Sequence, residues 1–245
     1  MVKKSDKKEK QSEEEMKKVE EDNKKNLEKK QNRQVLLVII FMVVLVVIVL
    51  LVPYVKKEFF NKFEYANLPF YKTKQGQITF YSARIPLVNN KGESVGNYAI
   101  NMREDPRSLD NITVNIPNDI YDFHRDKTVY ISLASDLPRC ADSIIGVTTV
   151  TDFLSNFGNM QIKAGISNQT YAKEQKFPYI TCQNSPNNTV ILYNYGINNS
   201  IVYDGKNCYV LTYNECNINR VSEKFVYQIL NDYMNKYVRT YGKVV

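Results

Sequence analysis

The strongest hydrophobic feature of the chain is an eighteen-residue run at positions 35–52 that contains no charged residue, glycine or proline. As a helix this run spans roughly 27 Å, close to the ~30 Å hydrocarbon core of a bilayer. A buried core helix of this length normally keeps some polar positions. The charged region before the run is too long for a cleaved signal peptide. The pattern therefore predicts a transmembrane signal-anchor helix at residues 34–53.

The segments on either side of this run are polar or aromatic. Residues 1–33 consist mainly of Lys, Glu, Asp, Gln and Asn, and they bury too little surface to fold alone. Pairs spaced by four, such as Glu13–Lys17, support a fluctuating helix in this tail. Residues 54–75 carry Phe and Tyr among lysines, a composition typical of the membrane–water interface. We expect a disordered or fluctuating tail and a juxtamembrane linker.

Beyond position 75 the pattern alternates between the period of a strand and that of a helix. The predicted strands are 76–87 and 95–103, which form a hairpin, then 128–134, 160–166, 189–195, 200–204 and 208–214. The predicted helices are 141–157, 168–175 with Asn168 as its N-cap, and 220–238. Alternating strands and helices imply right-handed crossovers. Residues 76–245 are therefore expected to form one α/β domain with a mixed, largely parallel sheet, an N-terminal β-hairpin and a C-terminal helix.

Basic residues predict how the anchor is oriented. Seven Lys or Arg lie in the twenty residues before Gln34, against four in the twenty after Pro53. The positive-inside rule then places the N-terminal tail in the cytoplasm and the C-terminal domain outside the cell. All cysteines lie in the C-terminal domain, as expected in an oxidising compartment. Four N-x-S/T sequons also lie there, at Asn111, Asn168, Asn187 and Asn198, and are candidates for glycosylation.

The four cysteines favour two disulfides over a metal site, because zinc ligands usually come in close pairs and these residues do not. Cys208 and Cys216 flank a predicted strand, whose length of roughly 26 Å exceeds the reach of a disulfide. Cys140 and Cys216 both follow parallel strands, whereas Cys182 and Cys208 precede them. The predicted pairs are Cys140–Cys216 and Cys182–Cys208. This pairing fails if residues 177–182 form a parallel strand, because Cys182 would then lie at the opposite edge.

Few residues indicate catalysis or a cofactor. The only histidine, His124, has charged neighbours and no serine or cysteine in a nucleophile motif, so a surface loop is favoured. The chain lacks phosphate-binding and zinc-protease motifs, and we expect neither a cofactor nor a metal. The densest charged cluster of the domain is Arg103, Glu104, Asp105 and Arg107. This cluster can bind a cation or an acidic sugar, but a turn held by ion pairs is favoured because Asp-Pro commonly starts turns.

The net charge of +7 does not indicate nucleic acid, because no dense basic patch with interleaved aromatics accompanies it. The expected partners are the membrane lipid bilayer and a protein or glycan. N-M-R-E-D-P-R, P-Y-I-T-C and C-Y-V-L-T-Y-N-E-C resemble single-pass membrane surface proteins of small-genome archaea, a group with no known activity. That resemblance implies a topology and no reaction.

Three functional classes stay open on the sequence. A surface protein for binding or envelope assembly is favoured. The alternatives are a receptor that signals through its charged tail and an ectoenzyme with an unidentified reaction.

Overall fold

The computed structural model describes residues 32–53, 55, 61–89, 91–117, 128–135, 137–138, 140–185, 187–205 and 207–242. The chain divides into two compact units, residues 1–60 and 61–245. Residues 1–31 of the predicted tail and residues 118–127, which include His124, lie outside the described residues.

The first unit contains the predicted membrane-spanning segment as a helix, Asn32–Pro53, whose apolar window of eighteen residues has a mean hydropathy of 3.9. The large hydrophobic side chains from Val35 to Val52 are all exposed, each by 45 % or more. A helix that is apolar on every side and buries none of its surface is not the core helix of a folded domain. Its length and composition allow it to cross a membrane.

The second unit begins with a four-stranded antiparallel sheet in the order β1-β2-β3-β4. Its strands are β1 (Lys62–Tyr65), β2 (Leu68–Gln75), β3 (Ile78–Val88) and β4 (Ser94–Met102). The predicted hairpin is confirmed as β3 and β4, which pair in an antiparallel register. It belongs to a sheet of its own.

The predicted linker at 54–75 is wrong from residue 61 onward, because β1 and β2 occupy this segment. Phe63, Tyr65 and Phe70 lie on the inner side of these strands: Phe70 is buried, and the Phe63 ring stacks on it at 5.7 Å, whereas Tyr71 is exposed. Ala66 and Asn67 both adopt positive φ and form a tight two-residue turn between the strands. Phe63, Tyr65 and Phe70 thus belong to the domain, and the folded unit starts before position 76.

A six-stranded mixed sheet forms the other side of the domain, in the order β5-β9-β10-β8-β6-β7. Its strands are β5 (Thr113–Asn115), β6 (Thr128–Leu133), β7 (Gln161–Ile166), β8 (Thr189–Tyr195), β9 (Ser200–Tyr203) and β10 (Cys208–Tyr213). The β6, β7, β8 and β10 strands run parallel, and β9 returns antiparallel to β10. The predicted mixed, largely parallel sheet is therefore confirmed. It also contains β5, a strand that the sequence does not predict.

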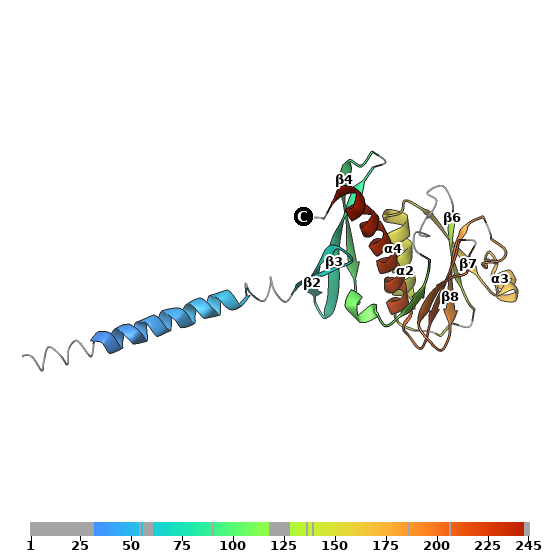
Figure 1. Ribbon diagram of the computed structural model, residues 1–245. Coiled ribbons are helices and arrows are strands. Elements are labelled where there is room, and N and C mark those ends of the chain that lie inside the picture. Colours follow the sequence, from blue (N-terminus) through green and yellow to red (C-terminus); the bar gives the residue numbers. More distant parts are fainter. Residues whose placement is uncertain are drawn as a thin grey trace, which may run out of the picture. The chain divides into compact units, whose positions relative to one another are not determined.

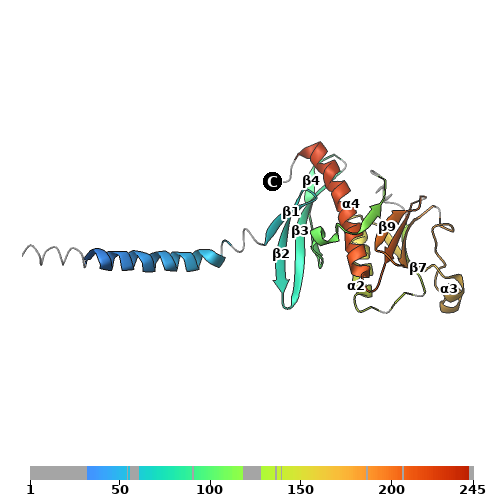
Figure 2. The same cartoon turned by 60° about the horizontal axis from the view of Figure 1, so that its bottom comes forward.

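Two long helices, α2 (Ser143–Asn156) and α4 (Ile218–Tyr241), lie between the two sheets (Figures 1 and 2). The Phe70 ring of the small sheet contacts Tyr227 of α4 at 5.7 Å, and Tyr209 of the large sheet contacts Phe225 at 5.3 Å. Residues 221–227 of α4 are therefore buried on every side, unlike the single hydrophobic stripe of a surface helix. A short helix, α3 (Gln169–Gln175), lies beside β7, and the predicted Asn168 cap is confirmed.

The two central helices approach closely at Gly146 of α2. A β-carbon at this position would lie 3.0 Å from the Asn219 Cα and 3.0 Å from the Ser222 Oγ of α4. Because one of these atoms belongs to the backbone, the helices must move apart to admit a methyl group.

We expect Gly146→Ala to lower the free energy of unfolding by about 1–3 kcal/mol, despite the ~1 kcal/mol that alanine contributes to helix propensity. Urea unfolding of the full chain in detergent measures this loss. Ser155→Ala, on the exposed side of α2, is the control and should not destabilise the domain. A Gly146→Ala protein as stable as the wild type would show that the helices are not in this close contact.

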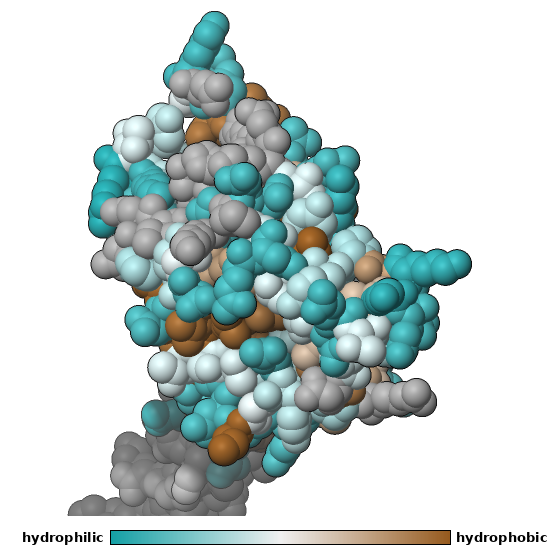
Figure 3. Space-filling view, turned by 90° about the vertical axis from the view of Figure 1, so that its right-hand side faces the viewer, coloured by the Kyte–Doolittle hydropathy of each residue, from teal (hydrophilic) through white to brown (hydrophobic). Residues whose placement is uncertain are grey.

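The outer face of the large sheet is partly covered by the chain between α3 and β8. The Ile180 side chain packs over Gly165 of β7, and the Ser132 hydroxyl of β6 donates to the Ile180 carbonyl at 2.7 Å. Tyr130, Leu192 and the Cys182–Cys208 bridge pack beside Ile180. The domain surface on the side of β7 and α3 carries a hydrophobic patch bordered by hydrophilic residues (Figure 3).

Candidate functional site

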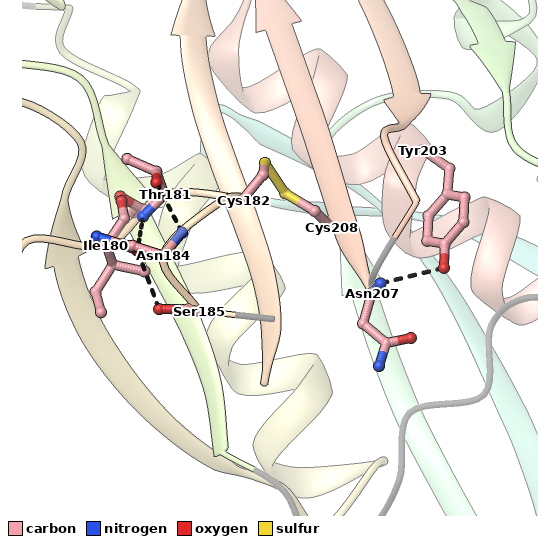
Figure 4. The surroundings of a disulfide bond; sticks show 9 residues. Ile180, Thr181, Cys182, Asn184, Ser185, Tyr203, Asn207 and Cys208 are labelled. Carbon is pink, nitrogen blue, oxygen red and sulfur yellow. Dashed lines mark hydrogen bonds between the residues drawn. A yellow bond between two sulfur atoms is a disulfide. The ribbon is translucent and has the colours of Figure 1, made fainter. Parts of the chain in front are cut away.

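Both disulfides join the residues predicted from the sheet edges, Cys140–Cys216 and Cys182–Cys208, with Cα separations of 5.5 and 5.4 Å. Cys140 and Cys216 follow β6 and β10 at the carboxyl edge of the large sheet. Cys182 lies in a turn in which the Thr181 amide donates to the Asn184 side chain at 2.8 Å (Figure 4). The chain does pair with Ile166 of β7 through a single bridge at Tyr179, but it then crosses to the amino edge before Cys182.

The predicted charged cluster, Arg103, Glu104, Asp105 and Arg107, follows β4 and leads into the 3-10 helix η2 (Pro106–Leu109). Asp105 caps this helix and forms two hydrogen bonds with the Arg107 guanidinium, at 2.9 and 2.6 Å. These bonds hold the pKa of Asp105 below its usual range. The Arg107 guanidinium also lies 4.0 Å from the Phe63 ring centroid. Asp105 and Arg107 therefore pair with each other within this turn, and the binding of a cation or an acidic sugar by the cluster stays a prediction.

This turn is fixed to α4 by Glu223, a carboxylate that is only 1 % exposed. The backbone amides of Arg103 and Glu104 donate to its two carboxylate oxygens at 2.8 and 2.7 Å. The Asn219 side chain donates to the same group at 3.3 Å. Burial raises the pKa of Glu223 to about 7, although the hydrogen bonds from the two amides act in the opposite direction. Glu223 is thus a titratable group within the domain core.

A second buried charge follows directly on α4. The Lys224 ammonium is almost fully buried and contacts the Asp110 carboxylate at 2.9 Å, and the Tyr65 hydroxyl donates to the same oxygen at 2.9 Å. Burial alone would raise the pKa of Asp110, but the hydrogen bonds from Lys224 and Tyr65 outweigh it and lower that pKa. Lys224, Asp110 and Tyr65 therefore connect α4, the end of η2 and β1.

A pocket of about 520 Å³ opens at the carboxyl ends of β6 and β7, next to the start of α2. It is lined by Leu133, Ala134, Ser135, Leu137, Pro138, Cys140, Ser143, Ile144, Val147, Thr148, Ile166, Tyr171 and Ile218. Ligands of open α/β sheets bind at this edge, outside the carboxyl ends of the strands. The bridge between Cys140 and Cys216 fixes the rim of the pocket.

The chemistry of this pocket suits an apolar group. Its side-chain polar atoms are the hydroxyls of Ser135, Ser143, Thr148 and Tyr171, and the Ser143 hydroxyl is buried without a hydrogen-bond partner among the described residues. Ile144 stands at the mouth with 78 % of its surface exposed. The sequence predicts no ligand for this edge. The one signal for the location is Cys140, which the sequence places at the carboxyl edge of the parallel strands.

The remaining predicted residues lie apart from the pocket or outside the described chain. The sequon asparagines are all exposed, and they are Asn111, Asn168, Asn187 and Asn198. Asn168 accepts a hydrogen bond from the Tyr171 amide through Oδ1, which leaves its Nδ2 atom available for a glycan. Among the described residues, no three His, Cys, Asp or Glu side chains gather as metal ligands.

Comparisons with protein-family models, with curated proteins and with solved structures found no match. The resemblance to single-pass surface proteins of small-genome archaea therefore stays a prediction.

Proposed function

We propose that this chain is a single-pass membrane protein that displays its disulfide-stabilised α/β domain outside the cytoplasm, where the domain binds a protein partner. The apolar helix Asn32–Pro53 supplies the anchor. The excess of basic residues before the helix favours a cytoplasmic tail, and the two disulfides favour an oxidising compartment for the domain. The exposed sequons are compatible with this side of the membrane.

The observation that carries the binding function is the open apolar pocket at the carboxyl edge of the large sheet. Apolar side chains that line such a pocket gain free energy when a partner covers them, and the exposed Ile144 at its mouth adds to that area. A lining of aliphatic side chains and hydroxyls selects an apolar side chain rather than a sugar or a phosphate. The proposed partner is therefore a protein that inserts an aliphatic or aromatic side chain.

Photocrosslinking in native membranes tests this function. A photoreactive side chain at position 144 should form an adduct of defined mass with the partner. Ser135→Arg should reduce the adduct several-fold, because it places a charge at the pocket. Ser155→Arg makes the same change on the exposed side of α2, outside the pocket, and should leave the adduct intact. An adduct that survives Ser135→Arg, or no adduct at all, would contradict the proposal.

A further inference from the structure

One strand of the small sheet has an unusually unprotected edge. β4 is an end strand of nine residues, Ser94–Met102, without a charged residue or proline. The other end strands are short or charged: β1 contains Lys62 and Glu64, β5 has three residues, and Lys163 lies in β7. Proteins usually protect long edges with charges, prolines or covering segments. Within the described residues, β4 has none of these.

The backbone groups along the outer edge of β4 are arranged as strand pairing requires. From Gly96 to Met102 the register with β3 is regular, and the irregularity at Leu87 and Val88 affects only the hairpin end. In an antiparallel pair, alternate residues direct their N–H and C=O groups away from the partner strand. No described strand or side chain bonds to this edge of β4. Its backbone groups can therefore pair with an added strand.

A groove beside this edge can receive the side chains of such a strand. The groove lies between β4 and α2, has a volume of about 440 Å³, and includes Tyr98, Ile100 and Phe153 among its lining. The Tyr98 ring contacts Phe153 at 6.2 Å and Phe157 at 5.5 Å, which fixes β4 against the helix. Beyond the last residue of β4, the Arg103 guanidinium lies 3.7 Å from the Asp142 carboxylate at the start of α2.

We infer that β4 binds an extended segment of a partner protein by strand addition, with a Lys or Arg of that segment facing Asp152. Asp152 is the only charged residue among those that line the groove, and no described basic side chain pairs with it. Its charge also contributes, after burial, to a raised pKa of Tyr98. In strand addition, main-chain hydrogen bonds provide affinity and every second side chain of the added strand provides specificity. Here the specificity comes from the basic side chain of the partner that faces Asp152.

Charge complementarity decides against a second copy of this chain as the occupant. The β4 strand of a second copy is uncharged and cannot neutralise Asp152. This inference uses an edge and a groove separate from the carboxyl-edge pocket, although Ile144 and Thr148 border both.

A random peptide library displayed on phage, selected on the full chain in nanodiscs, tests this inference. Enriched peptides should alternate in hydrophobicity and carry Lys or Arg at one fixed position. Replacing that residue with Glu should weaken binding at least about fivefold, the effect of exchanging an attractive for a repulsive exposed pair. Asp152→Lys should reverse the preference, whereas Asp204→Lys, an exposed control beyond the groove, should not change it.

Hydrogen exchange with the best peptide locates the contact. Within 97–102, the alternate amides that point away from β3 should exchange more slowly when the peptide is bound, and those of β1 should not change. Methylating peptide amides that face β4 should abolish binding. The inference is overturned if no peptide is enriched, if the charge preference survives Asp152→Lys, or if protection maps elsewhere. It is also overturned if sedimentation of the unliganded chain shows a dimer with β4 already protected, because a second copy then occupies the edge.

Discussion

Replacing Cys140 and Cys216 together with serine should lower the free energy of unfolding by about 4.5 kcal/mol. The bridge closes a loop of 76 residues, and the loss follows from the loop-closure entropy that this cross-link removes from the unfolded chain. It also fixes the segment just before α2 to the segment just before α4, at the rim of the apolar pocket. Urea unfolding of the full chain in detergent, followed by the near-ultraviolet signal of its tyrosines, measures the loss.

The second bridge provides the matched control. Cys182 and Cys208 close a loop of 26 residues, for which the same entropy relation gives about 3.5 kcal/mol. The double serine variant at these positions should therefore lose less stability than the Cys140 and Cys216 variant. The pair of losses is large against the 5–15 kcal/mol stability of a typical domain. Losses below about 1 kcal/mol for the longer loop would contradict the assigned structural role of the bridge.

Raising the pH from 4.5 to 7 should destabilise the domain through Glu223 by up to about 3 kcal/mol. Its pKa is raised from 4.5 in the unfolded chain to about 7 in the folded domain. In this window the folded state binds a proton that the unfolded state has released. The stabilisation from Glu223 is therefore complete below pH 4.5 and is lost as the pH rises through 7.

Glu223→Gln isolates this contribution, because glutamine does not titrate. The difference in unfolding free energy between wild type and Glu223→Gln should change with pH across this window, whereas Glu174→Gln on the exposed surface of α3 should follow the wild type. Asp105 and Asp110 act in the opposite sense. Their pKa values are lowered in the folded domain, so the stabilisation that they provide is lost as the pH falls into the acidic range. A pH-independent difference for Glu223→Gln would contradict the raised pKa.

The parts of the fold that the sequence predicts well are those with strong periodicity and local signals. The strands β6, β8 and β10 are recognisable as runs of β-forming residues. The Asp204–Gly205 pair predicts the tight turn that joins β9 to the antiparallel β10, and Gly205 adopts a φ of 77° there. These elements place each cysteine at one edge of the sheet. The disulfide map follows because edge position is fixed by strand direction alone.

The parts that the sequence does not predict depend on tertiary context. The turn at Ala66 and Asn67 lacks the glycine that usually marks such a turn, so the aromatic residues around it resemble a membrane-interface segment. Glu223 and Lys224 lie in a helix whose pattern predicts one buried stripe. They are buried because α4 lies between two sheets. The apolar pocket likewise requires three separate segments to meet, which no local pattern indicates.

Protease treatment of intact cells tests the central claim, an anchored chain with its domain outside. The full chain carries a different epitope tag at each end. External protease should remove the C-terminal tag and leave the N-terminal tag on a membrane-bound fragment that contains the helix Asn32–Pro53. After the membrane is opened with detergent, the N-terminal tag should also be lost. Loss of the N-terminal tag from intact cells, or survival of both tags until the membrane is opened, would contradict the account.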